Sequence, residues 1–325
     1  MSEGVSQQTV PEREFLISPG PHVWRGLSVT KIMYLVMLAL LLPTTASVYY
    51  FGYYALSVIA VSVAAAVLTE YVAKKLRRRA FVMDGSAVLT GLLFALILPP
   101  TIPLWMVAIG SVFSIAIVKE AFGGLGHNIF NPALGGRAFM TACFAVGMTT
   151  WVSPMGFAAD AVTSATPLSE AFFWQGDKIS LYQALLLGNT GGSIGETSAL
   201  LILIGGLLLL ALGIINWRIP LTYIGTVALL TFALGQDPIF HILAGGLMLG
   251  AFFMATDYVT SPLTDKGKII FGLGAGVLTV VIRHFGSMPE GVCYSILFMN
   301  AVTPLIDRYV TVRPYGLRKV VKGEG

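Results

Sequence analysis

Long apolar stretches separated by short polar segments dominate the pattern of this chain. Runs such as 33–42, 198–215 and 239–254 contain no Asp, Glu, Lys or Arg and do not alternate between apolar and polar positions. Such runs are typical of membrane-spanning helices. In lipid every backbone amide must be satisfied internally, and strands do so only in closed barrels whose side chains alternate. We therefore predict an all-α polytopic membrane protein.

Breaks at proline, glycine and charged residues divide the apolar stretches into about ten candidate transmembrane helices. They cover residues 29–51, 53–73, 86–100, 103–119, 132–150, 198–215, 219–235, 239–256, 268–283 and 290–308. The parts outside them are an N-terminal segment at 1–28, a long polar loop at 151–197 and a basic tail at 309–325. The loop separates helices 1–5 (29–150) from helices 6–10 (198–308).

The composition agrees with a membrane protein and excludes several kinds of site. The chain has 325 residues, of which 56% are hydrophobic and 11% charged, and its mean hydropathy is +0.81. A soluble domain carries about 25% charged residues. Cys143 and Cys293 form neither a CxxC pair nor a Cys/His cluster, so we expect both to be core residues and expect no metal site. No GxGxxG with a following acid marks a dinucleotide site, and no catalytic residue is predicted.

The distribution of basic residues predicts an orientation. If the N-terminus is cytoplasmic, ten helices leave every Lys and Arg except Lys178 and Arg283 on the cytoplasmic side. This bias follows the positive-inside rule and supports both the helix count and cytoplasmic N- and C-termini. The loop 151–197 is then extracytoplasmic. The basic run 74–79 is interpreted as a segment beside anionic lipid, so the partner is the bilayer and not nucleic acid.

Short matches between the two halves point to an internal duplication. Asn131-Pro132 resembles the segment Asn300–Pro304, and the polar break 84–86 resembles 257–261. Five helices per half would place the halves in opposite orientations, as two inverted five-helix repeats. Because the matches are short, chance stays open as the alternative.

The polar loop contains the most distinctive segment of the chain. Thr166-Pro167 followed by Glu170 has the pattern of a helix start, with threonine as N-cap and proline at the first helical position. A phosphate esterified to the same threonine would rest over the free amides of the first helical turn. A surface helix alone and a phosphate site are therefore compatible interpretations.

The sequence just before the proline matches a modification motif. Asp160-x-x-Thr163-Ser164-Ala165-Thr166 resembles the flavinylation motif, in which a flavin transferase moves FMN from FAD onto the last threonine. An unactivated threonine is a weak nucleophile, so an external enzyme is a sensible requirement. The resemblance implies covalent FMN on Thr166, with Asp160, Ser164 and Ala165 as recognition residues.

Further stretches resemble one family over nearly the whole chain. They are 119–134, 192–198, 254–257 and 285–291. Together they are similar to the D subunits of the Rnf ion-translocating ferredoxin:NAD oxidoreductases and to their paralogues, the B subunits of the sodium-translocating NADH:quinone reductases. The quinone-reductase paralogue usually has a longer N-terminal extension, so the Rnf branch is favoured. The resemblance implies the FMN-bearing G subunit of the complex as electron donor, and riboflavin near Asn128 and Asn131.

Several of these residues also have a structural interpretation. Asn131 before Pro132 is a standard N-cap, and Ser193 with Glu196 has the pattern of a capping box opening helix 6. Ser193, Gly195 and Glu196 are at the same time predicted neighbours of the flavin. The alternatives stay open here.

Five acids lie near the predicted cytoplasmic helix ends, where we expect most of them to lie at the membrane interface or to pair with the adjacent Lys and Arg. They are Glu70, Asp84, Glu120, Asp257 and Asp307. Asp257 and Glu120 are the candidates for a coupling role.

The predicted function is an electron-relay subunit of an Rnf complex in the prokaryotic cytoplasmic (inner) membrane. The complex would translocate Na⁺ or H⁺, and the other Rnf subunits and the transferase would be partners. The alternatives are a small-solute channel or secondary transporter without a redox role, and a scaffold subunit.

Overall fold

The computed structural model describes residues 28–154, 166–168, 176–286 and 291–311, and the regular secondary structure within these ranges is helical. The all-α prediction therefore holds for the described part of the chain. By length and composition, two described helices, Val29–Leu76 and Asp265–Phe285, qualify as membrane spans, and four more are shorter apolar helices. The count of ten transmembrane helices stays a prediction.

The first half of the bundle begins with the longest helix. The helices of this half are α1 (Val29–Leu76), α2 (Ser86–Leu96), α3 (Leu104–Phe113), the π-helix η1 (Ser114–Glu120), α4 (Pro132–Cys143) and α5 (Ala145–Thr149). Inside α1, Gly52 adopts φ 72° and ψ −159°, which are not helical angles. Only glycine adopts such a conformation without strain. The predicted boundary between helices 1 and 2 at this residue is therefore confirmed.

The second half contains more breaks than the sequence predicted. Its helices are α6 (Lys178–Leu187), α7 (Ala199–Ala211), α8 (Arg218–Ala233), α9 (Pro238–Leu243), α10 (Leu247–Leu249), the π-helix η2 (Gly250–Met254), α11 (Asp265–Phe285) and α12 (Val292–Tyr309). The predicted helix 239–256 is divided because Gly245 and Gly246 have φ of 70° and 67°. Helix α6 lies inside the segment predicted as a loop.

Capping explains where two of the helices begin. Asn131 Oδ1 accepts a hydrogen bond from the Ala133 amide at 3.0 Å, and Pro132 follows at the first position, so the predicted N-cap is confirmed. Helix α7 is capped by Ser198, whose Oγ accepts from the Leu201 amide at 3.4 Å. The predicted capping box is therefore wrong: Ser193 and Glu196 contact each other in a turn before the helix.

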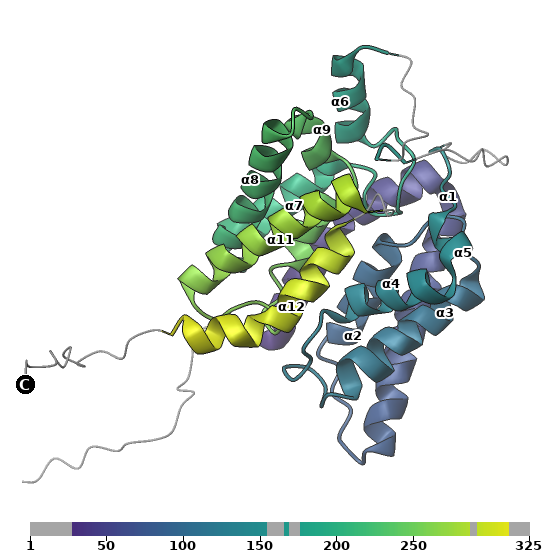
Figure 1. Ribbon diagram of the computed structural model, residues 1–325. Helices are drawn as coiled ribbons and strands as arrows, with labels where there is room; N and C mark the ends of the chain where they lie inside the picture. Colours follow the sequence, from purple (N-terminus) through teal and green to yellow (C-terminus); the bar gives the residue numbers. More distant parts are fainter. Residues whose placement is uncertain (1–27, 155–165, 169–175, 287–290, 312–325) are drawn as a thin grey trace, which may run out of the picture.

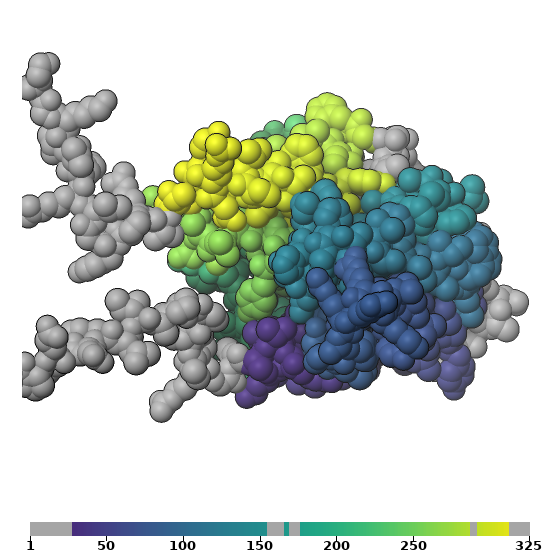
Figure 2. Space-filling model, turned by 90° about the horizontal axis from the view of Figure 1, so that it is seen from below, coloured from purple at the N-terminus to yellow at the C-terminus, as the bar shows by residue number. Residues whose placement is uncertain are grey.

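The two halves pack separately and meet along two seams (Figure 1). In one half α1 packs against α2 and α3, and in the other α11 packs against α8 and α12. The halves contact each other through α1 with α7 and through α4 with α12. Seen from below, α12 and the blue segments of the first half lie side by side (Figure 2).

Large apolar side chains point outward from the bundle. Leu221, Leu229 and Phe232 on α8 are 60%, 68% and 75% exposed. Soluble monomers rarely expose contiguous apolar surface of this kind. The outer surface is therefore that of a membrane protein.

Candidate functional site

Thr166 lies in a cleft near the turn after α9. The cleft encloses about 360 Å³ of space, part of it open to solvent, and its walls include Thr190, Glu196 and Gly245. Thr166 is only 4% exposed, and its Oγ1 is buried without a hydrogen-bond partner among the described residues. The other predicted motif residues, Asp160, Ser164 and Ala165, lie outside the described residues, as does the helix predicted beyond Leu168.

The turn 193–196 reaches this cleft through Glu196. Ser193 Oγ donates to Glu196 Oε1 at 3.0 Å, and Arg137 Nη1 lies 3.6 Å from the same oxygen. Gly195 donates its amide to the Leu96 carbonyl, and a Cβ there would lie 2.6 Å from Leu96 Cβ. Glycine is therefore needed so that the turn can pack against the end of α2. Of the three predicted flavin neighbours in this turn, Glu196 is the one that lines the cleft with Thr166.

A larger cavity lies between the two π-helices. It encloses about 760 Å³, part of it open to solvent, and combines apolar side chains from α1, α7 and η2 with a few polar groups. Ligand pockets of proteins are lined mostly by apolar side chains with a few placed polar groups, and this cavity has such a lining. Single turns of π-helix occur frequently at functional sites. Asn128, Asn131 and Asp257 all line the cavity, and the riboflavin expected near the two asparagines stays a prediction.

The two asparagines differ in how their side chains are used. Asn131 is committed to the fold, because its Oδ1 caps α4 and its Nδ2 donates to the Met254 carbonyl at 3.3 Å. Asn128 donates from Nδ2 to the Phe130 carbonyl at 3.0 Å, whereas its Oδ1 is buried without a partner in the described structure. Asn128 therefore keeps an acceptor available to a ligand.

The matched segments of the suspected duplication meet here without being equivalent. With its side-chain amide turned so that oxygen and nitrogen exchange places, Asn300 accepts a hydrogen bond from the backbone N–H of Asn131 at 3.1 Å, but it lies inside α12, whereas Asn131 precedes α4. The inverted repeat stays a prediction.

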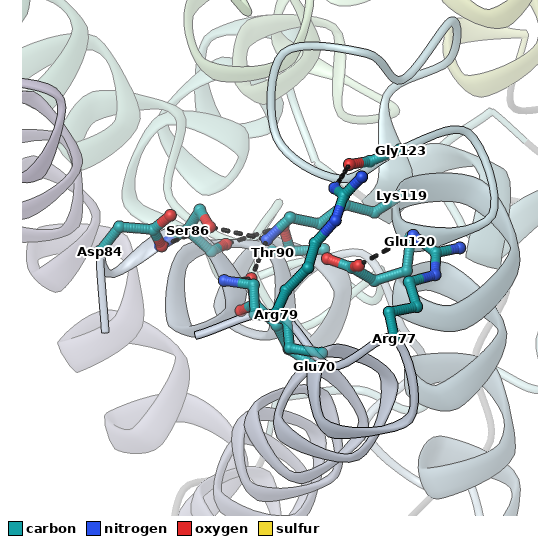
Figure 3. Close-up of polar contacts among 10 residues, drawn as sticks. Glu70, Arg77, Arg79, Asp84, Ser86, Thr90, Lys119, Glu120 and Gly123 are labelled. Carbon is teal, nitrogen blue, oxygen red and sulfur yellow. Dashed lines mark hydrogen bonds and ion pairs between the residues drawn. The ribbon is translucent and has the colours of Figure 1, made fainter. Parts of the chain in front are cut away.

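A cluster of buried charges adjoins the same cavity (Figure 3). Lys119 is 1% exposed, and its Nζ lies 3.1 Å from Glu70 Oε1 and donates to Ser86 Oγ at 2.6 Å. Lys74 Nζ lies 2.8 Å from the same Glu70 oxygen, and Arg77 Nη1 lies 3.4 Å from Glu120 Oε2. The predicted pairing of Glu70 and Glu120 with basic residues is thus confirmed.

Two basic residues occupy positions that the charge pattern did not predict. Lys119 and Arg137 were counted among the basic residues of the cytoplasmic side, yet both are buried in the bundle, at 1% and 8% exposure. Their acidic partners, Glu70 and Glu196, come from segments distant in sequence. Lys119 and Ser86 line the cavity and were not predicted as site residues. The sequence feature that could have identified Lys119 as a site residue is its position in the stretch 119–134, which resembles the family.

The remaining acids accept hydrogen bonds, Asp84 and Asp257 from residues close in sequence and Asp307 from a distant segment. Asp84 Oδ1 accepts from the amide and hydroxyl of Ser86 at 2.9 and 2.6 Å. Asp257 Oδ2 accepts from Thr260 Oγ1 at 3.1 Å, and Asp307 Oδ1 accepts from the Leu263 amide at 3.0 Å. Burial raises the pKa of Asp84, but its bonds from Ser86 and the charges of Lys119 and Lys74 outweigh this effect and lower the pKa below its usual value.

One of the two cysteines lies in the core, as the sequence predicted, and the other does not. Cys293 is buried, and its thiol contacts the Leu134 carbonyl at 3.5 Å, as expected of a core residue. Cys143 is exposed, so the expectation of a core position was wrong for it. It is the last residue of α4, where the helix ends against solvent or lipid.

Comparison with known proteins shows the relationship of the chain. Residues 16–316 match the model of the NQR2, RnfD, RnfE family. The chain is 50% identical, over 97% of its length and 100% of the relative, to the D subunit of the proton-translocating ferredoxin:NAD(+) oxidoreductase complex of Clostridium ljungdahlii. It is 48% identical, over 96% of its length and 98% of the relative, to the D subunit of the Na(+)-translocating ferredoxin:NAD(+) oxidoreductase complex of Acetobacterium woodii.

A third relative is more distant and its name leaves the ion open. It is the D subunit of the ion-translocating oxidoreductase complex of Stutzerimonas stutzeri, 43% identical over 89% of this chain and 92% of the relative. The matches extend over nearly the full length of the chain and include the residues of both cavities. The chain therefore belongs to the NQR2, RnfD, RnfE family.

Proposed function

We propose that this chain is the flavin-carrying membrane component of an ion-translocating ferredoxin:NAD oxidoreductase complex. FMN is attached by a phosphoester to Thr166, and the other Rnf subunits, above all the FMN-bearing G subunit, are its partners. The complex lies in the prokaryotic cytoplasmic membrane, with the segment 151–197 on the outer side. Similar relatives are named for protons and for Na⁺, so the proposal leaves the ion open.

The observation that carries the covalent-flavin proposal is the position of Thr166 Oγ1. It ends the motif Asp160-x-x-Thr163-Ser164-Ala165-Thr166 and lies at a cleft as a buried oxygen with no partner among the described residues. A buried hydroxyl normally forms a hydrogen bond, so its lack of one needs an explanation. Esterification supplies that explanation, because it removes the hydroxyl proton and places a charged group in the cleft.

The attachment reaction needs the flavin transferase. Thr166 Oγ1 loses its proton and forms a bond to the flavin-side phosphorus of FAD, while the pyrophosphate bond breaks and AMP leaves. Because Thr166 is 4% exposed, we place this step before the segment 166–168 seats in the cleft. The attached group supplies reversible electron transfer, and the chain positions it and tunes its surroundings.

We assign a second, non-covalent flavin, riboflavin, to the cavity between the π-helices. Asn128 Oδ1 is the open acceptor of its lining, and the imide N–H of an isoalloxazine ring is a suitable donor. Asn131 supports the cavity by fixing the start of α4. The side chain that we assign to ligand contact is therefore that of Asn128.

A gel experiment tests the covalent flavin. The chain is produced with the transferase, denatured, separated and illuminated with ultraviolet light. We expect a fluorescent band for the unmodified sequence and complete loss of the band for Thr166→Ala. Thr190→Ala, which changes another buried threonine of the same cleft, is the matched control and should keep the band.

The rival functions make different predictions in this experiment. A small-solute channel or transporter without a redox role gives a dark band for every variant. A scaffold role gives a fluorescent band, but Thr166→Ala then leaves the ferredoxin:NAD activity of the complex unchanged. A dark band from cells that contain active transferase overturns the proposal.

A further inference from the structure

Three buried polar atoms without a partner gather around one turn. Of the five such side-chain atoms in the described residues, Thr166 Oγ1, His241 Nδ1 and Arg283 Nε belong to this region. The turn comprises residues 241–245, from the last residues of α9 to the segment before α10. Natural folds leave few buried polar groups unsatisfied, and a concentration of them at one place points to a group that the protein chain itself does not supply.

The guanidinium of Arg283 is fixed by this turn. Nη1 donates to the His241 carbonyl at 2.6 Å, and Nη2 donates to the carbonyls of Ala244 and Gly245 at 3.0 and 3.2 Å. These contacts hold the side chain in one orientation near the C-terminal end of α9. They leave Nε–H unused, and no carboxylate of the described residues lies within ion-pair distance of the guanidinium. Among the described residues, the guanidinium therefore bonds directly only to backbone carbonyls, and the Glu196 carboxylate acts on its charge from beyond ion-pair distance.

Gly245 joins Arg283 to the Thr166 cleft. A Cβ at Gly245 would lie 2.1 Å from Leu168 Cδ1 and 2.9 Å from Arg283 Nη2. The segment 166–168 and the guanidinium therefore approach the same point from two sides. Gly245 and Ala244 also line the cleft together with Thr166. The absence of a side chain at Gly245 allows this close approach.

The acid nearest to this place is already engaged. Glu196 lines the cleft, and its Oε1 accepts from Ser193 Oγ at 3.0 Å and faces Arg137 Nη1 at 3.6 Å. Its charge is therefore offset by Arg137. Among the described residues, Arg283 is then a cation beside the cleft with no carboxylate within ion-pair distance, although Glu196 acts on it from farther away.

We propose that Arg283 holds the phosphate of the FMN carried by Thr166. A phosphoester oxygen is anionic and accepts charge-assisted hydrogen bonds, which a fixed guanidinium donates with little loss of conformational freedom. The ligand would satisfy the Nε–H that the turn leaves unused and would neutralise the buried charge. The assignment rests on the proposed attachment at Thr166, and it makes Arg283 a positioning residue.

The test compares variants of the full chain produced with the transferase. The variants are Arg283→Gln, Arg283→Lys and, as matched control, Lys178→Gln, which changes the exposed basic residue that shares the predicted outer side. Gel fluorescence first establishes that each variant carries covalent flavin. Fluorescence anisotropy and iodide quenching of that flavin in the native protein are then measured, with Thr166→Ala as the blank for non-covalent flavin.

We expect Arg283→Gln to lower the anisotropy and to raise the quenching constant about threefold or more, because the phosphate loses its charge-assisted bonds. Arg283→Lys keeps the positive charge but loses the planar, forked arrangement of N–H donors, so it should give intermediate anisotropy and quenching. Lys178→Gln should match the unmodified sequence. If Arg283→Gln does not accumulate in cells, the anisotropy and quenching of Arg283→Lys alone test the role of Arg283.

The outcomes separate this inference from the proposed function. A fluorescent band with unchanged anisotropy and quenching in the Arg283 variants overturns the role of Arg283 and leaves the flavin at Thr166 standing. A dark band for the unmodified sequence overturns the attachment itself, and with it the role of Arg283.

Discussion

The Thr166 cleft and the Lys119 cluster both place polar groups among apolar helices, but they satisfy them differently. In the cluster, Lys119 contacts Glu70 and Ser86, and Glu70 also faces Lys74, so nearly every charge is paired within the chain. One oxygen of Glu120 is the exception. Thr166 Oγ1 in the cleft and Arg283 Nε beside it have no hydrogen-bond partner among the described residues.

This difference separates groups that support the fold from groups that face a ligand. Leaving a buried donor or acceptor unsatisfied costs about 1–3 kcal/mol. The fold supplies Lys119 with partners from the chain itself, so it could also pair polar groups elsewhere with its own residues. The open groups of the cleft are therefore best explained by a partner from outside the chain, and the paired groups of the cluster by internal stabilisation.

The largest effect should come from breaking the paired cluster. Lys119→Met leaves Glu70 with Lys74 alone in a buried place, and removing one partner of a buried pair costs about 3–5 kcal/mol. Thermal unfolding of the purified chain measures the loss. Lys75→Met, which changes a neighbouring lysine outside the buried cluster, is the control and should change little. Adding Glu70→Gln to Lys119→Met should recover part of the loss, and no recovery would contradict the pairing.

A smaller loss of stability should follow when a methyl group is added at Gly195, where the turn 193–196 packs tightly against α2. In Gly195→Ala the new methyl meets Leu96 Cβ at 2.6 Å, and such overpacking costs about 1–3 kcal/mol. Gly225→Ala is the control, because no atom lies within 4 Å of its added Cβ and alanine favours the helix. Equal melting temperatures for the two variants would show that the turn does not pack as described.

The two asparagines of the cavity should respond in opposite ways. Asn131→Ala removes the N-cap and the bond to the Met254 carbonyl, and it should lower the stability by about 1 kcal/mol or more. Asn131→Ser keeps a capping oxygen and buries no charge, so it should lose less. Asn128→Ala should leave the stability within about 0.5 kcal/mol, because Asn128 Oδ1 has no partner to lose among the described residues, but it should reduce the non-covalent flavin extracted from the purified chain. Equal flavin loss in Asn128→Ala and Asn131→Ser would contradict the assignment of ligand contact to Asn128.

The smallest predicted effect is the pH dependence of the stability that Asp84 contributes. The lowered pKa of this carboxyl means that it stabilises the fold above its unfolded pKa and that this contribution is lost as the pH falls through the folded pKa. Asp84→Asn should therefore destabilise the chain at neutral pH, and the difference from the unmodified sequence should shrink toward pH values near about 3. Melting temperatures of both proteins across this range measure it. A difference in melting temperature that grows as the pH falls would show that the pKa of Asp84 is not lowered by the fold.

Much of the helix pattern could be predicted from the sequence because it depends on local interactions. The apolar runs, the break at Gly52 and the N-cap at Asn131 all depend on a few neighbouring residues. The breaks inside 239–256 were missed because a Gly-Gly pair also fits a continuous helix, and only contacts with Leu168 and Arg283 select the turn. The capping box failed for a similar reason: Ser193 and Glu196 do contact each other, but their turn packs against Leu96 before the helix begins.

By itself, the sequence determined the helical membrane character, the pairing of Glu70 and Glu120 with basic residues and the position of the motif that ends at Thr166. These features follow from hydropathy and from short fixed spacings. Only the tertiary structure decided that Lys119 and Arg137 are buried, that Asn131 is used by the fold while Asn128 keeps an open acceptor, and that Arg283 approaches the cleft of Thr166. The reason is physical: whether a polar group is paired depends on partners far away along the chain, and no local pattern specifies which distant groups will meet.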